Sequence, residues 1–353
     1  MNGKKRKELY SLELTEAGIE DVQIPKSLQN PHSPEAKQKM DALPDSWEGA
    51  GISSRAYGVP DFILVGAAKA GTTSLYWALH AHPQIYMSRN KEPNFFSKPP
   101  SHPNGPQDEI SCRSYIRTID AYLDLFKDKK NNQICGEASP SYLYFTESAK
   151  QIKDCNDRAK IIIILRNPVE RAYSNYMHMR RDGREYCSFI SAIEMEQKRE
   201  KSGWEWSWMY KKCGLYYESV KKYLDTFDEP NVNIILYDDF VIEPTRCIKN
   251  IYNFLGVDPL FIPTVRKFNV TGEPRSKWIQ TLITYDSNIK TRLKKYIPPL
   301  IRFRIREGLT RLNLKKIEMD SSAKKQLIKY YTEDIERLAK LIRKDLSFWI
   351  KMD

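Results

Sequence analysis

Residues 61–74 hold the pattern in this sequence that is best suited to chemistry on a phosphate group. Apolar residues 62–65 precede a glycine, as in a buried strand, and a helix with an apolar stripe is expected from Ser74. Gly66 and Gly71 enclose a loop of small residues. A strand, a glycine loop and a helix start direct backbone N–H groups and the positive end of the helix dipole at an anion. The pattern therefore predicts a phosphate-binding loop, with an ordinary glycine turn as the alternative.

This loop departs from the nucleotide P-loop at the position of the lysine. The motif GxxxxGK[ST] has its lysine directly after the second glycine. Here Thr72 stands at that position, and Lys69 lies inside the loop instead. In kinases and ATPases the P-loop lysine acts with a metal ion on the β- and γ-phosphates. The displaced lysine indicates a different anion and a reaction that needs no metal.

A second candidate for anion binding follows the apolar strand expected at residues 159–165. Arg166 comes directly after it, where a metal-dependent NTPase would carry an aspartate for magnesium. A guanidinium at the strand end is a fixed, forked donor for a second phosphate, and Ser174 on the next helix can add a hydroxyl. A surface ion pair is the alternative for Arg166. The loop 268–277, with two cations, is another possible phosphate clamp.

Glu92 is the candidate for proton transfer. It lies between Lys91 and Pro93, and the aromatic residues Phe95 and Phe96 follow. The aromatic pair would anchor the segment and partly remove the carboxylate from water, which favours a proton acceptor near neutral pH. On spacing alone, a surface loop carboxylate is an equal alternative.

The elements that must position these residues alternate along the chain. Strands are expected at 61–65, 84–87, 134–137, 159–165 and 231–237, and helices from 74 and near 115–126, 169–181, 189–199, 215–227, 243–255 and 322–343. This alternation predicts βαβ units, and therefore a three-layer α/β fold with a central, mainly parallel sheet. Residues 98–112 are expected to form a loop. The polar residues 1–56 predict an N-terminal extension before a domain at 57–353.

The composition limits the classes of partner and location. Among 353 residues, 57 Lys and Arg outnumber 45 Asp and Glu, which suits an anionic ligand. These cations are spread along the chain, so we do not expect nucleic-acid binding. No apolar run reaches 18 residues, so no membrane span is expected. Six separated cysteines without a CxxC motif are typical of reduced thiols in a cytoplasmic protein rather than of a metal site.

Taken together, the glycine loop, the Glu92 segment and the Arg166 segment resemble the sulfotransferases that use 3′-phosphoadenosine 5′-phosphosulfate (PAPS). The similarity extends over 57–353 and includes the segments 237–240 and 345–349. It is greatest to the branch that contains heparan sulfate sulfotransferases and many bacterial members. The resemblance implies a P-loop-NTPase-like sulfotransferase fold. It also implies transfer of a sulfuryl group to a hydroxyl or amine of a small-molecule, lipid or glycan acceptor.

The resemblance further implies a role for each site residue. Lys69 would stabilise the leaving phosphosulfate oxygens, and Glu92 would be the general base, with no metal required. Arg166 and Ser174 would hold the 3′-phosphate, and Arg275 would reach the nucleotide. The 5′-phosphosulfate would lie on the loop residues Lys69, Ala70, Gly71, Thr72, Thr73 and Ser74.

The sequence also departs from that family in ways that bear on the acceptor. Heparan sulfate enzymes have a second active-site lysine at the turn that corresponds to residues 137–142, and this turn has none. The paired cysteines and membrane anchor of secretory-pathway members are missing as well, which favours a cytoplasmic enzyme. No histidine stands in the motif that supplies the base in the hormone- and phenol-sulfating branch. Acceptor-binding residues are expected on the loops 88–112, 137–145 and 182–213.

Two other functions stay open at this point. A P-loop kinase or NTPase would need a lysine at position 72 and an aspartate at the end of the 159–165 strand. A catalytically inactive nucleotide-binding protein that docks partners would not need Lys69 and Glu92, and both are present. Neither the acceptor, nor the choice between O- and N-sulfation, nor the oligomeric state is indicated by the sequence.

Overall fold

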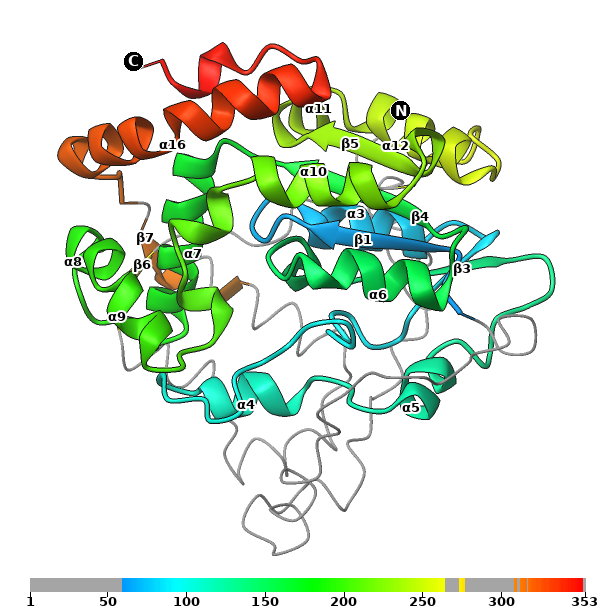
Figure 1. Cartoon of the computed structure of the whole chain (residues 1–353), viewed down its shortest axis with the longest axis horizontal. Coiled ribbons are helices and arrows are strands. Elements are labelled where there is room, and N and C mark those ends of the chain that lie inside the picture. The colour runs from blue at the N-terminus through cyan, green and yellow to red at the C-terminus, as the bar shows by residue number, and fades with distance from the viewer. Residues whose placement is uncertain (1–58, 264–272, 277–307, 310–311, 316, 352–353) are drawn as a thin grey trace, which may run out of the picture. The chain divides into compact units, whose positions relative to one another are not determined.

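The computed structural model describes residues 59–263, 273–276, 308–309, 312–315 and 317–351 (Figure 1). All of them belong to one of two compact units of the chain, the unit of residues 53–285 and 308–353. The extension predicted for residues 1–56 lies outside the described residues. So does most of the predicted clamp at 268–277, of which only 273–276 are described.

A five-stranded parallel sheet forms the centre of this unit. Its strand order is β2-β3-β1-β4-β5. The strands are β1 (Phe62–Gly66), β2 (Ile85–Met87), β3 (Ile134–Ala138), β4 (Lys160–Leu165) and β5 (Val232–Leu236). Every residue of β1, and every residue of β4 after the first, is buried. Burial on both faces explains why these strands are unbroken apolar runs in the sequence.

Helices cover both faces of the sheet. In Figure 1, α6 and α10 lie in front of the strands and α3 lies behind them. The longer helices are α3 (Thr72–His80), α6 (Glu147–Cys155), α7 (Pro168–Arg181), α10 (Tyr217–Thr226), α12 (Pro244–Leu255) and α16 (Ser321–Ile342). This arrangement confirms the predicted three-layer α/β fold. No described helix combines the length and the apolar character needed to cross a bilayer.

Several short helices differ from the expected pattern. They are α4 (Asp108–Arg113), α5 (Ile119–Asp124), α8 (Phe189–Glu194), α9 (Glu196–Lys201) and α11 (Tyr237–Ile242). The predicted loop at 98–112 was therefore wrong at its end, where α4 begins with two acidic residues. Carboxylates in a first turn stabilise a helix start, and the same feature explains α11. The single helix expected at 189–199 is interrupted at Met195, which ends α8 and precedes α9.

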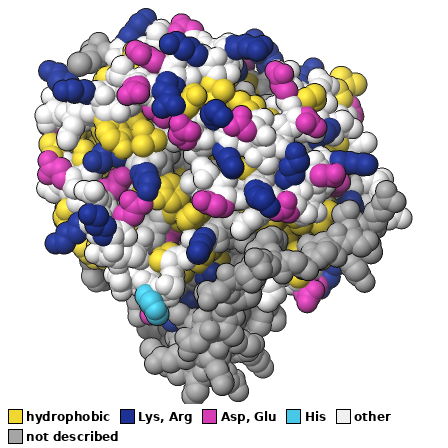
Figure 2. All heavy atoms as spheres, in the orientation of Figure 1, with side chains coloured by type: hydrophobic (Ala, Val, Ile, Leu, Met, Phe, Trp, Pro, Cys, Tyr) yellow, Lys and Arg dark blue, Asp and Glu magenta, His cyan; other side chains and the backbone are white. Residues whose placement is uncertain are grey.

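Acidic and basic side chains are mixed on one face of the unit (Figure 2). Figure 2 shows Lys and Arg interspersed with Asp and Glu over the face that carries α6 and α10. The described residues of this face form no continuous basic patch of the kind that binds a nucleic-acid backbone (Figure 2).

The chain changes direction sharply where β1 enters the glycine loop. The register between β1 and β4 shifts between Leu64 and Gly66. Gly66 has φ 151°, and a Cβ there would lie 2.7 Å from the Cβ of Leu143. Only glycine fits this position, and an irregularity of this kind redirects the residues that follow it.

Close packing between β1 and β3 gives a test of the fold. Gly136 is paired with Phe62, and a Cβ on Gly136 would lie 2.3 Å from Cζ of the ring. We expect Gly136→Ala to lower the free energy of unfolding by about 1–3 kcal/mol through overpacking. Urea unfolding measures this change. Gly308→Ala is the control, because its Cβ would meet no atom within 4 Å, and equal midpoints for the two variants would contradict this packing.

Candidate active site

The first turn of α3 is open toward an anion. Gly71 is the N-cap of this helix, has φ 93° and provides no side-chain cap. A Cβ on Gly71 would lie 3.1 Å from the ring of Tyr237, so a larger residue would not fit. Among the predicted loop residues, Ala70 and Thr72 are buried, whereas Lys69, Gly71, Thr73 and Ser74 are half-buried. Because no side chain caps this helix, its first N–H groups can bind an anion at the glycine loop.

Lys69 lies in the middle of this loop with a left-handed backbone, φ 67°. Burial, and then the charge of Arg181, lower the pKa of its amine to about 7, while Asp182 and Glu92 act in the opposite direction. Without a ligand, the amine is thus divided between its charged and neutral forms near pH 7. A bound anion would favour the charged form and draw a proton to the amine.

Glu92 follows β2 but is tied to the end of β3. Its N–H donates to the carbonyl of Ala138 at 3.1 Å, and its backbone is left-handed, with φ 65°. A non-glycine residue in that conformation costs about 1–3 kcal/mol, so the surrounding bonds must hold it. Its carboxylate forms an ion pair with Lys91. Its charge also acts on Lys69, so the two predicted catalytic residues lie near each other.

The aromatic pair after Glu92 anchors the segment as expected. Phe96 is buried, and the ring of Phe95 stacks on Tyr122 with centroids 4.4 Å apart. Phe96 also contacts Tyr142 edge-on, with centroids 5.5 Å apart. The segment is therefore fixed by packing as well as by hydrogen bonds.

Arg166 links the end of β4 to the glycine loop. Its Nη1 donates to the carbonyl of Lys69 at 3.2 Å, and its guanidinium lies 4.9 Å from the centre of the Tyr237 ring. Its Nη2 is 3.5 Å from a carboxylate oxygen of Glu170, a weak and partly exposed ion pair. The sequence analysis predicted that this guanidinium lies at the strand end, but it did not predict the hydrogen bond to the glycine loop. Arg166 therefore supports the loop whether or not it also contacts a phosphate.

The two other predicted nucleotide contacts lie on neighbouring elements. Ser174 is buried on α7. Arg275 follows β6 (Glu273–Pro274), which pairs with β7 (Leu314–Lys315) and lies beside α7. The Arg275 N–H donates to the carbonyl of Asn313 at 2.6 Å, and its side chain is exposed. The fold thus brings the Arg275 segment beside the helix that carries Ser174.

The last turn of α7 supplies site residues that the sequence analysis missed. Arg181 donates to Asp182 Oδ1 at 2.9 Å, and its Nη2 lies 2.6 Å from Nδ1 of His178. Burial, and then the charge of Lys69, hold the pKa of His178 well below its usual value, so its Nδ1 accepts the bond from Arg181. The i, i+3 and i+4 spacing from His178 was the available signal, because it places these side chains on one helical face.

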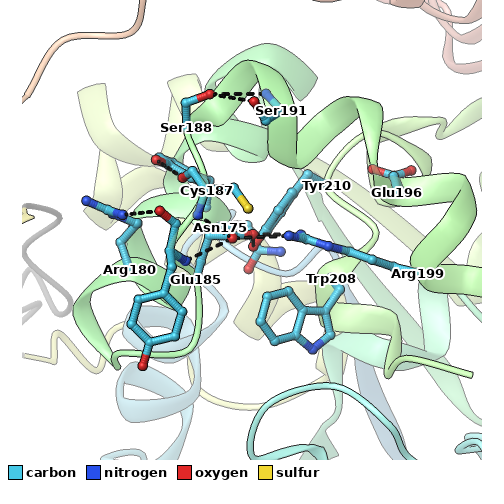
Figure 3. Close-up of polar contacts among 12 residues, drawn as sticks. Asn175, Arg180, Glu185, Cys187, Ser188, Ser191, Glu196, Arg199, Trp208 and Tyr210 are labelled. Carbon is cyan, nitrogen blue, oxygen red and sulfur yellow. Dashed lines mark hydrogen bonds and ion pairs between the residues drawn. The ribbon is translucent and has the colours of Figure 1, made fainter. Parts of the chain in front are cut away.

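An ion pair between Arg184 and the buried Asp108 joins two of the loops that are expected to bind the acceptor. Figure 3 shows Glu185 accepting from Arg199 and Tyr210; the Nη1–Oε2 distance to Arg199 is 2.6 Å and the Tyr210 bond is 3.1 Å. Arg184 donates through Nε to the carbonyl of Pro106 at 2.9 Å. Segments 98–112 and 182–213 therefore form one connected structure.

Trp208 lies in the hydrophobic core of this region, and Trp204 packs against that core. Trp208 is fully buried, and its indole N–H donates to Asp108 at 2.7 Å. The Arg199 guanidinium lies 4.9 Å from the ring centres of both Trp204 and Trp208. An indole held in this way is not available for stacking on a sugar or base.

Comparison with known proteins agrees with this geometry. A family model described as "Sulfotransferase domain" matches residues 59–291. The chain is 26% identical over 305 residues to the human bifunctional heparan sulfate N-deacetylase/N-sulfotransferase 3, which covers 84% of this chain and 31% of the relative. It is 26% identical over 255 residues to the mouse heparan sulfate glucosamine 3-O-sulfotransferase 3B1, which covers 72% of this chain and 60% of the relative. The chain thus spans less than two thirds of these curated relatives.

A solved structure shows the same fold. The crystal structure of a sulfotransferase from Alicyclobacillus acidocaldarius matches with a TM-score of 0.67 and 34% identity. The match covers 83% of this chain and 99% of that one. The family and fold predicted from the glycine loop and the Glu92 and Arg166 segments are confirmed, and this chain belongs to the sulfotransferase family.

Proposed function

We propose that this chain transfers a sulfuryl group from PAPS to a hydroxyl or amine of an acceptor. The observation that carries the proposal is the position of Lys69 and Glu92, which lie within electrostatic reach of each other beside an uncapped helix start. An uncapped helix start suits the phosphosulfate, and a nearby carboxylate suits removal of the acceptor proton. Membership of the sulfotransferase family supports the same reaction.

In the proposed reaction, the acceptor oxygen or nitrogen attacks the sulfur of the donor in line with the bridging oxygen. The new bond to sulfur forms as the bond between sulfur and the bridging oxygen breaks, and 3′,5′-adenosine bisphosphate leaves with that electron pair. Glu92 takes the acceptor proton. The charged amine of Lys69 stabilises the negative charge that develops on the leaving oxygen, which is electrostatic catalysis by a preplaced cation.

The second nucleotide phosphate would be held by Arg166 and Ser174, with Arg275 as a further contact. Arg166 lies just before α7, and Ser174 lies within this helix. Arg275 is on the segment beside the same helix. These assignments, and a cytoplasmic location, stay predictions. The kinase alternative has no support from the site, because the P-loop lysine position holds the buried Thr72.

The names of the relatives suggest a broad class of acceptor, but no particular molecule. Their names include heparan sulfate N- and 3-O-sulfotransferases, which supports a glycan as the first class to test. The position of their second lysine corresponds to a turn in which Ala138 and Ser139 are buried here, so contacts to the acceptor must differ there. Lipids and small alcohols therefore belong in the same screen.

Titration of the purified chain with 3′,5′-adenosine bisphosphate, beside ATP with magnesium, tests the donor site. We expect calorimetry to show tight binding of the bisphosphate and none of ATP. Arg166→Ala should weaken the bisphosphate by roughly 10- to 100-fold, the value of a hydrogen bond to a charged group. Adenosine 5′-phosphate, which lacks the 3′-phosphate, is the control. Equal losses for both ligands would mean that Arg166 acts only through the loop, and ATP binding would reopen the kinase alternative.

Donor binding should also take up a proton at Lys69. The pKa of about 7 leaves this amine mostly neutral at pH 8, and the bound anion would restore its charge. Affinity should therefore fall as the pH rises above 7. Calorimetry at pH 8 in buffers of different ionisation enthalpy should report uptake close to one proton. Lys69→Arg keeps its charge at both pH values, so uptake that persists in this variant would assign the proton to another group.

Transfer of radiolabelled sulfate from PAPS tests the two catalytic assignments. Lys69→Ala should lose roughly 10²- to 10³-fold in rate, the value of one contact to a developing oxyanion. Glu92→Gln should lose roughly 10²- to 10⁴-fold, the range for general base catalysis. Lys127→Ala and Glu218→Gln are matched controls on exposed residues. Full activity in either active-site variant would remove that residue from the mechanism.

A further inference from the structure

Glu137 is a fully buried carboxylate for which the proposed reaction has no use. It lies on β3 and accepts three hydrogen bonds, all from hydroxyl groups. Its Oε1 accepts from Tyr122 at 3.0 Å and from Tyr142 at 2.7 Å, and its Oε2 accepts from Ser139 at 2.7 Å. Burial raises the pKa of this carboxyl to about 7, and the three donors act in the opposite direction. Such a group is expensive to keep in a core, which calls for a reason.

The Ser139 hydroxyl connects Glu137 to the segment that carries Glu92, because it forms a hydrogen bond with each of them. A hydroxyl has one hydrogen to donate, and here it goes to Glu137. The lone pairs of Ser139 Oγ are thereby left to accept the N–H of Asn94 at 3.1 Å. The orientation of the Ser139 hydroxyl is thus set by its hydrogen bond to the Glu137 carboxylate.

Asn94 in turn holds Glu92. Its Oδ1 accepts a hydrogen bond from Ser141 at 2.6 Å, which fixes the orientation of the amide. In this orientation its Nδ2 donates to the carbonyl of Glu92 at 2.8 Å. Glu92 and Asn94 both have left-handed backbones, with φ of 65° and 51°. A residue other than glycine rarely adopts this backbone conformation unless its surroundings impose it. The Ser139 and Ser141 bonds are among the contacts that impose it.

We infer that Glu137 is a positioning residue that, through Ser139 and Asn94, fixes the backbone of Glu92 so that its carboxylate meets the acceptor. The inference rests on the proposed function for the part played by Glu92, but the chain of hydrogen bonds stands apart from it. Glutamine at position 137 has one accepting oxygen in place of two. It can satisfy the tyrosines or Ser139, but not all three, and its amide would compete with Asn94 for the Ser139 oxygen.

Glu137→Gln is the test, in wild-type and Glu92→Gln backgrounds. We expect kcat for sulfate transfer to fall roughly 10- to 100-fold, as for a lost hydrogen bond to a charged group, while the KM for PAPS changes less than about twofold. In the Glu92→Gln background the further loss should be less than about twofold, because Glu137 acts through Glu92. Equal losses in both backgrounds, or an unchanged kcat, would overturn the inference.

A second readout needs no acceptor and no catalysis. Amide hydrogen exchange of residues 91–97 should become faster in Glu137→Gln, while exchange in β1 and β4 stays as in the wild type. Unchanged exchange at 91–97 would also overturn the inference. If the wild type transfers no sulfate, the proposed function fails, and faster exchange would still support the hold of Glu137 on this segment.

Two further variants separate positioning from general destabilisation. Ser139→Ala removes only the hydroxyl link, and we expect it to reproduce the kcat and exchange effects if Glu137→Gln does not fold. Asp334→Asn weakens another partly buried carboxylate, which accepts from the N–H groups of Tyr216 and Tyr217 at the start of α10. It should lower the thermal midpoint without changing kcat. A fall in kcat that matches that of Glu137→Gln would show that loss of stability alone explains both.

Discussion

Parallel pairing of β1 with both β3 and β4 is the constraint on which the site depends. Parallel strands release their carboxyl ends at the same edge of a sheet, so three segments distant in sequence must meet there. The glycine loop follows β1, the turn that binds Glu92 follows β3, and Arg166 follows β4. The register shift at the end of β1 then directs the loop toward α3. Without this pairing, the cation, the carboxylate and the helix start would not share one site.

The charged groups of the candidate site act on one another. Burial, and then the charge of Arg181, disfavour the charged amine of Lys69, and Asp182 and Glu92 compensate only in part. If the proposed anionic donor binds beside Lys69, it would favour the charged amine, and donor binding would then be coupled to proton uptake. Lys91 supplies a countercharge to the Glu92 carboxylate. This balance of charges would favour an anionic ligand over a neutral one.

Buried polar networks fix the loops around this site. Glu137 accepts hydrogen bonds from three hydroxyl groups near the Glu92 segment, and Glu185 accepts hydrogen bonds from Arg199 and Tyr210 within the loop 182–213. Buried charges contribute little net stability, but each specifies one arrangement because its partners cannot be exchanged. Loops that are rich in proline and glycine become defined in this way without long regular elements.

The sequence by itself determined the sheet, the family and the chemical types at the site. Buried parallel strands are continuous apolar runs, and Gly66, Gly71 and Lys69 carry a local signal because loop geometry depends on adjacent residues. Only the tertiary structure decided how Arg166 binds the loop, where His178 and Arg181 lie, and how Glu137 reaches Glu92 through Ser139 and Asn94. Those contacts join residues up to 97 positions apart in sequence. The spacing of His178 and Arg181 was a local signal, but no local pattern encodes the contacts of Arg166 with Lys69 or of Ser139 with Asn94, because these partners are set by the packing of whole elements.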